Sequence, residues 1–184
     1  MKRDNTLHYL AYGSNLHPYR LIQRVPNARL VATTRLDGYG VSFSKRSHDG
    51  SSKCNLANKG RADSTAYVAI YELPIVEKRL LDVAEGLGKG YDHARYGVRV
   101  ASKAYDVFTY VAATTHIVRE LLPYDWYKSI VIEGAHYHGF PDDYIGNLES
   151  QPSRPDPDVR RRLAAEELVN QMRKQKGAPS GAPR

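Results

Sequence analysis

The stretch Leu10-Ala11-Tyr12-Gly13-Ser14-Asn15-Leu16 is the most informative part of this 184-residue sequence. It joins a short apolar run over residues 7–12, rich in strand-forming residues, to a cluster of turn and helix-capping residues. The pattern predicts a buried strand, a tight turn and then a short helix with Pro18 in its first turn. If the helix begins at Ser14 or Asn15, unpaired backbone N–H groups converge at the turn and favour an anion there. An ordinary capped turn gives the same string, so both interpretations stay open.

A second informative string lies about 70 residues later, at Glu85-Gly86. Apolar residues recur at three- to five-residue spacing after Pro74, which predicts a helix with a glycine stop at Gly86. A carboxylate at that end faces the negative pole of the helix, so burial there would raise the pKa of Glu85 and suit it to proton transfer. A solvated glutamate at an exposed helix end is the alternative. The series Gly86-x-Gly88-x-Gly90 is not a dinucleotide loop, because it leaves a helix and enters a strand.

The rest of the chain alternates strand and helix patterns. Strand patterns occur over residues 28–34, 38–44, 54–57, 65–73, 96–100 and 106–112. Helical patterns occur over residues 126–135 and 142–148, and in a tail helix with Asp156 as cap and Pro157 at its first position. We therefore expect one domain over residues 1–149, followed by a basic tail over 150–184 that comprises a proline-rich linker, a helix and a disordered end from residue 177.

The charge distribution argues against a nucleic-acid-binding protein. The formal net charge is +7, of which residues 1–149 carry +3 and residues 150–184 carry +4. None of the 18 aromatic residues lies in this tail, which therefore lacks the stacking groups of single-strand readers. Nucleic acid is accordingly not an expected partner.

Composition favours a cytoplasmic globular protein. The sequence is 41% hydrophobic with a mean hydropathy of −0.56, and it has no apolar run of the roughly 18 residues that a membrane span needs. Residues 1–6 are polar and no signal-peptide pattern follows them. A single cysteine, Cys54, excludes an internal disulfide and a thiolate metal cage, which fits a reducing compartment.

Two other kinds of catalytic site can be weighed from residue types. His136-x-His138 with Asp142 and Asp143 has the composition of a metal-dependent hydrolase site. On a helix, however, positions 136 and 138 lie about 200° apart, and both imidazoles fit a structural role at the helix end. Cys54 has no accompanying histidine signature and is expected to be packed rather than nucleophilic. We therefore expect no metal.

The two informative strings, in this order and spacing, resemble the gamma-glutamylcyclotransferase-like family. The resemblance covers residues 7–149 and includes these further landmarks: Pro123-x-x-x-Tyr127, Gly134-Ala135, Gly139-Phe140-Pro141 and Tyr144. Phe140 departs from the leucine that is common there, and the loop over residues 47–63 resembles an insertion. The resemblance implies an α+β fold, a small mixed β-barrel with flanking helices, to which this chain adds a C-terminal helix.

The resemblance also implies a reaction that needs no cofactor. The α-amine of a small γ-glutamyl amino acid or amine attacks its own γ-carbonyl and releases 5-oxoproline, with Glu85 as general base and then acid. The tethered nucleophile gives a high effective molarity, on the order of 10⁵ M in favourable cases. The residues expected to bind substrate, two of them from resemblance alone, are Tyr12, Gly13, Ser14, Asn15, Leu16, Tyr91 and Tyr127.

The resemblance leaves two matters open. The oligomeric state is expected to be monomer or homodimer. The alternative function is a non-catalytic binding or interaction module of the same fold, whose basic tail reaches an acidic partner.

Overall fold

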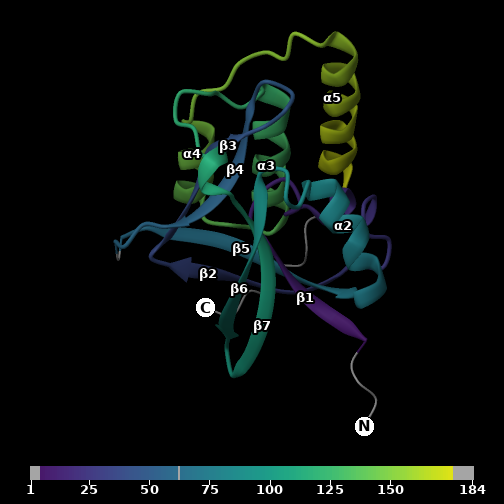
Figure 1. The fold of residues 1–184 in the computed structure, drawn as a ribbon, viewed down its shortest axis with the longest axis vertical. Helices are drawn as coiled ribbons and strands as arrows, with labels where there is room; N and C mark the ends of the chain where they lie inside the picture. The colour runs from purple at the N-terminus through teal and green to yellow at the C-terminus, as the bar shows by residue number, and fades with distance from the viewer. Residues whose placement is uncertain (1–4, 62, 176–184) are drawn as a thin grey trace.

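The fold is built around a curled five-stranded sheet (Figure 1). The computed structural model describes residues 5–61 and 63–175. The strands are β1 (Thr6–Ala11), β2 (Arg29–Asp37), β3 (Tyr39–Arg46), β4 (Ser52–Asn58), β5 (Thr65–Pro74), β6 (Tyr91–Val100) and β7 (Lys103–Ala112). The sheet has the order β2-β5-β1-β7-β6, and β3 and β4 form a separate antiparallel pair. The α+β class and the mixed barrel are confirmed, with the barrel present as a curled, open sheet.

β1 is the central strand, parallel to β7 and antiparallel to β5. Leu10 and Ala11 have no exposed surface, and Tyr9 is almost as deeply buried. A strand that is covered on both faces is apolar throughout rather than alternating, which explains the continuous run at residues 7–12. The turn that follows β1 therefore starts from the middle of the core.

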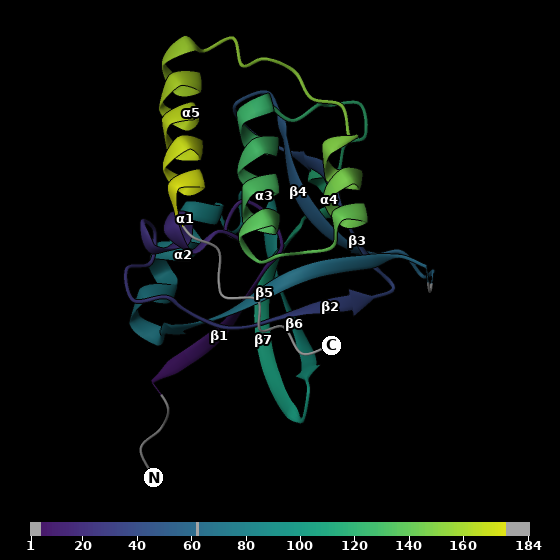
Figure 2. The ribbon, with the colours of Figure 1, turned by 180° about the vertical axis from the view of Figure 1, so that it is seen from behind.

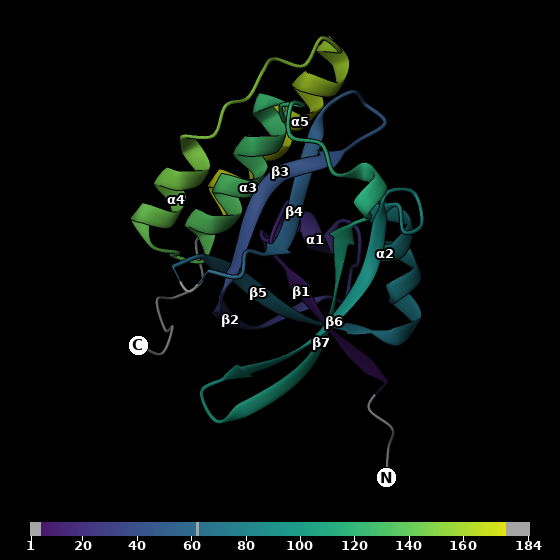
Figure 3. The same cartoon turned by 60° about the vertical axis from the view of Figure 1, so that its left-hand side comes forward.

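The helices pack around this sheet. They are α1 (Pro18–Ile22), α2 (Lys78–Glu85), α3 (Asp125–Tyr137), α4 (Asp142–Glu149) and α5 (Val159–Lys174), with 3₁₀ turns at Ile75–Glu77 and Thr114–His116. Figure 2 shows α5, α3 and α4 side by side on one side of the molecule. Figure 3 shows α2 beside the long β6–β7 hairpin. The predicted glycine stop of α2 is confirmed, since Gly86 has φ 66° and its N–H reaches the carbonyls of Asp82 and Val83.

The predicted first residues of α1 and β6 are wrong. The first helix begins at Pro18, not at Ser14 or Asn15, and His17 caps it through Nδ1, which accepts from the Tyr19 N–H. Pro18 has no N–H to lose and a helical φ, so it fits the first helical position. β6 begins at Tyr91 instead of residue 96, because ten residues pair with β7 in unbroken register.

The tail helix also begins later than expected. Asp158, not Asp156, caps α5 by accepting from the Arg161 N–H, and Pro157 precedes the helix. Asp156 is buried and accepts instead from Trp126 Nε1 at 2.8 Å and Arg161 Nε at 2.6 Å. This pairing holds the proline-rich linker against α3.

α5 packs on α3 through a small second core. Ile130 of α3 meets Val169 and Met172 of α5, all buried. The predicted disordered end from residue 177 lies outside the described residues. Within the described ranges, no helix has both the length and the apolar composition to cross a membrane.

The two helical glycines give a matched test of close packing. A Cβ on Gly134 of α3 would lie 2.5 Å from Leu16 Cβ and 3.1 Å from the His17 backbone nitrogen, whereas a Cβ on Gly146 of α4 would meet nothing within 4 Å. We expect Gly134→Ala to destabilise the protein by about 1–3 kcal/mol through overpacking. Gly146→Ala should stabilise it by about 0.5–1 kcal/mol. Urea unfolding of both variants measures the difference, and equal effects would contradict the packing of α3 on the turn.

The Asp156 contacts predict how α5 is anchored. Asp156→Ala leaves Arg161 and the Trp126 N–H without their acceptor, so we expect the melting temperature to fall by roughly 5 °C or more. The Arg161 guanidinium holds the pKa of Asp156 well below its usual range. The contribution of the Asp156 carboxylate to stability is therefore complete above pH ~4, the unfolded-state pKa. The difference in melting temperature between the parent and Asp156→Ala should narrow as the pH falls below that value. Asp106→Ala, at an exposed pair with Arg95, is the control and should change little.

Candidate active site

Glu85 and the turn after β1 meet although they lie 70 residues apart in sequence. Glu85 is the last residue of α2, and its Oε1 accepts from Asn15 Nδ2 at 2.9 Å. Arg24 Nη1 donates both to Glu85 Oε1 at 2.6 Å and to Asn15 Oδ1 at 2.8 Å. Asn15 Nδ2 also donates to the Tyr9 hydroxyl at 3.1 Å. The carboxylate, the guanidinium and the amide thus form a closed triangle.

Arg24 provides the Glu85 carboxylate with a positively charged hydrogen-bond donor. Only 14% of the Glu85 side chain and 23% of the Arg24 side chain are exposed. The helix dipole disfavours a negative charge at this end of α2, and the Arg24 guanidinium at 2.6 Å from Glu85 Oε1 opposes that effect. Arg24 lies 61 residues from Glu85 in sequence, so no local pattern around the end of α2 indicates this contact.

The turn at residues 12–16 is fixed by contacts on both sides. The Leu16 N–H donates to the Gly13 carbonyl at 3.0 Å, and the Leu16 carbonyl accepts from the Tyr71 hydroxyl. Among the described residues, no turn or loop hydrogen bond uses the N–H groups of Gly13, Ser14 or Asn15. The amides available to a ligand are therefore those at positions 13–15, while the Leu16 amide is already used.

Gly13 is required by the close approach of the turn to β4. A Cβ at this position would lie 2.9 Å from Cys54 Cβ, closer than side chains tolerate. The absence of a side chain lets the turn backbone lie directly against the strand.

Tyr91 and Tyr127 contact this same strand residue. The Tyr91 hydroxyl donates to the Cys54 carbonyl at 2.6 Å, and the Tyr127 oxygen accepts from the Cys54 N–H at 3.1 Å. Burial raises the pKa of both phenols well above the usual value, so both are neutral. The Tyr12 hydroxyl donates to the Tyr110 carbonyl. These tyrosines brace the walls of the site.

Two adjoining hollows lie between these groups. The inner recess has a volume of about 20 Å³, close to the space of one water molecule. The outer cleft has about 600 Å³, in the range of small-molecule sites. Both are lined by Ser14, Glu85, Tyr91 and Tyr127.

The structure brings most of the predicted site residues together. Along with Glu85, the recess is lined by Tyr12, Gly13, Ser14, Asn15, Tyr91 and Tyr127. Leu16 does not line it and is packed in the core. The cleft contains further charged residues that sequence analysis did not identify, namely Arg20, Arg24, Lys45, Asp49, Lys53 and Lys89. No sequence motif marks these residues, because they come from separate segments that meet only in the folded chain.

The residues of the other two candidate sites are placed differently. His136 Nε2 lies 3.9 Å from a Glu149 oxygen, whereas His138 Nε2 lies 2.7 Å from the Leu16 carbonyl. The two rings thus have separate partners, and no cluster of three or more metal-ligating residue types occurs in the described ranges. Cys54 is buried and its thiol pKa is raised to about 12, chiefly by burial, which disfavours the nucleophilic thiolate.

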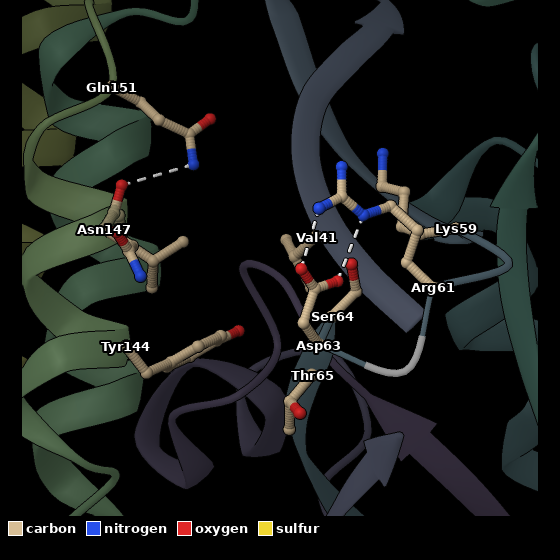
Figure 4. A pocket seen from close by; sticks show the side chains of 11 residues that line it. Val41, Lys59, Arg61, Asp63, Ser64, Thr65, Tyr144, Asn147 and Gln151 are labelled. Atoms are coloured by element: carbon tan, nitrogen blue, oxygen red, sulfur yellow. Dashed lines mark hydrogen bonds and ion pairs between the residues drawn. The ribbon is translucent and has the colours of Figure 1, made fainter. Parts of the chain in front are cut away.

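A separate pocket of about 440 Å³ lies between α4 and the strands. Figure 4 shows Tyr144 and Asn147 of α4 on one side, facing the ion pair of Arg61 and Asp63. This ion pair is exposed, and none of the predicted catalytic or substrate-binding residues lines the pocket. The candidate site residues therefore all lie outside this pocket.

Comparison with known proteins finds a family match for part of the chain. The model of the AIG2-like family matches residues 65–148, which include Glu85, Tyr91 and Tyr127. No curated protein matches the chain.

Solved structures share the fold of the whole domain. The uncharacterized protein loc79017 from Homo sapiens has a TM-score of 0.77 at 21% identity, covering 91% of this chain and 99% of that one. A gamma-glutamyl cyclotransferase has a TM-score of 0.76 at 21% identity, covering 90% and 99%. YkqA from Bacillus subtilis has a TM-score of 0.68 at 22% identity, covering 83% of this chain and 57% of that one.

The resemblance drawn from the sequence is thereby confirmed: over residues 65–148 the chain matches the AIG2-like family, which is the gamma-glutamylcyclotransferase-like family, and it adopts the fold of a gamma-glutamyl cyclotransferase.

Proposed function

We propose that this protein is a gamma-glutamylcyclotransferase that needs no cofactor and releases 5-oxoproline from a small γ-glutamyl compound. The observation that carries the proposal is the position of the Glu85 carboxylate, which faces the amides of residues 13–15 across a recess that adjoins a cleft of ligand size. The match of the AIG2-like family model to the segment that contains Glu85 supports the same reaction class.

The reaction needs little from the protein beyond proton transfer and positioning. The α-amine and the γ-carbonyl belong to one molecule, so attack closes a five-membered ring without a covalent enzyme intermediate. The substrate amine is an ammonium ion at neutral pH and must lose a proton first. The departing nitrogen must gain a proton before the amide bond breaks.

Glu85 can perform both proton transfers. Its Oε1 already accepts from Asn15 and Arg24, while no hydrogen bond to Oε2 occurs among the described residues. We assign Oε2 as the oxygen that takes the proton from the α-ammonium. The neutral amine then forms the new C–N bond at the γ-carbonyl carbon, and the proton returns from Oε2 to the leaving nitrogen as the old C–N bond breaks. The ring nitrogen gives up its second proton to the departing amine, which leaves as an ammonium ion.

The turn and the triangle of contacts give this step its geometry. Amides at positions 13–15 are the donors available to the glutamyl carboxylate or to the oxyanion that develops on the carbonyl oxygen. Asn15 and Arg24 restrain the carboxylate, which limits the orientations that Oε2 can adopt. Tyr91 and Tyr127 line the recess and contact the glutamyl part there.

The test is release of 5-oxoproline from a panel of γ-glutamyl amino acids and γ-glutamylamines. We expect turnover of at least one compound by the parent, and a loss of kcat of at least 100-fold in Glu85→Gln, which keeps the shape but cannot take the proton. Glu149→Gln, at the exposed last position of α4, is the matched control and should retain parental kcat.

Two outcomes would contradict the proposal. An active Glu85→Gln variant would remove this residue from the proton transfer. A folded parent that binds γ-glutamyl compounds in calorimetry but forms no 5-oxoproline would favour the non-catalytic binding module instead.

A further inference from the structure

The outer cleft holds more positive charge than its own carboxylates can balance. Five cationic side chains line it, from Arg20, Arg24, Lys45, Lys53 and Lys89, against two carboxylates. Each carboxylate already has one close cation. Glu85 is 2.6 Å from Arg24, and Asp49 is 2.7 Å from Lys53.

The remaining cations include two that are largely withdrawn from solvent. Arg20 Nε is fully enclosed and has no hydrogen-bond partner among the described residues. Burial and the neighbouring Arg24 lower the pKa of Arg20 to about 10. A buried guanidinium atom without an acceptor is costly, which is a feature of sites that receive a ligand.

Lys45 is the second of these cations. The residue is only 6% exposed, and its Nζ lies 4.6 Å from the centre of the Tyr91 ring. No salt bridge to Lys45 occurs in the described part of the chain. Burial lowers the pKa of its ammonium, while the charges of Glu85 and Asp49 act in the opposite direction. Both of those carboxylates are paired with other cations, so a further anion would stabilise the charged form of Lys45.

We propose that Arg20 and Lys45 form an anion subsite for the leaving group, and that the preferred substrate is a γ-glutamyl conjugate of an acidic amino acid. This inference rests on the proposed function, because the subsite lies in the cleft that adjoins Glu85. The glutamyl part contributes one carboxylate, which leaves at least two unbalanced cations in the cleft. A dicarboxylic leaving group supplies both missing charges, whereas an alkylamine supplies none.

The experiment compares γ-glutamyl-glutamate with γ-glutamyl-glutamine, which has nearly the same shape but one less negative charge. We expect the parent to favour γ-glutamyl-glutamate by at least tenfold in kcat/KM, mostly through a lower KM, and γ-glutamyl-ethylamide to be the poorest substrate. High salt should reduce the preference because it screens partly exposed charges.

Substitutions assign the preference to the two residues. Arg20→Gln and Lys45→Gln should each reduce the ratio of the two kcat/KM values toward one, and Arg20→Lys should restore part of it. Arg79→Gln removes an exposed cation of α2 that does not line the cleft, and it should retain the parental ratio. Circular dichroism checks that each variant is folded.

A binding measurement separates failure of this inference from failure of the proposed function. The Glu85→Gln protein is titrated with the same two dipeptides by calorimetry, so that binding is read without turnover. Tighter binding of γ-glutamyl-glutamate that is lost when Arg20→Gln is added supports the subsite, even if the parent forms no 5-oxoproline. Equal binding and equal kcat/KM for the two dipeptides, or a preference unaffected by both substitutions, would overturn it.

Discussion

The need to satisfy a largely buried carboxylate at the end of a helix determines how this site is assembled. Glu85 keeps only 14% of its side chain exposed, and the C-terminal end of α2 offers it no donors of its own. Donors come instead from Asn15 and Arg24, which lie 70 and 61 residues away in sequence. A buried charge that lost such partners would be strongly destabilising, so α2, the turn after β1 and the end of α1 are energetically linked.

The local parts of this arrangement were predictable because they depend on short-range physics. The apolar run of β1, the turn at Gly13 and the glycine stop after Glu85 each follow from backbone preferences within a few residues. Their proximity, by contrast, was supplied by resemblance to a family. No pattern in the sequence indicates that the strand ending at residue 11 and the helix ending at residue 85 lie close together in space.

The parts that were missed depend on long-range contacts. Arg24 lies one residue beyond the cap of a five-residue helix, where a solvated arginine is the usual outcome. Its role exists only because α2 ends beside it. The same reason explains the error at α5: Asp156 and Asp158 are equally good caps in sequence, and the burial of Asp156 against Trp126 decides between them.

Three of the 14 tyrosines of the chain form part of the wall of this site. A wall of Tyr12, Tyr91 and Tyr127 is apolar toward the recess, yet each hydroxyl has a backbone group to bond. Phenylalanine at these positions would remove the hydrogen bonds to Tyr110 and Cys54. The recess that these tyrosines line has a volume of about 20 Å³, and its walls of buried side chains lower the local dielectric constant, which strengthens the electrostatic interactions of Glu85 and the turn amides. The tyrosine contacts to Cys54 and Tyr110 therefore fix the shape of the recess that Glu85 and the turn line.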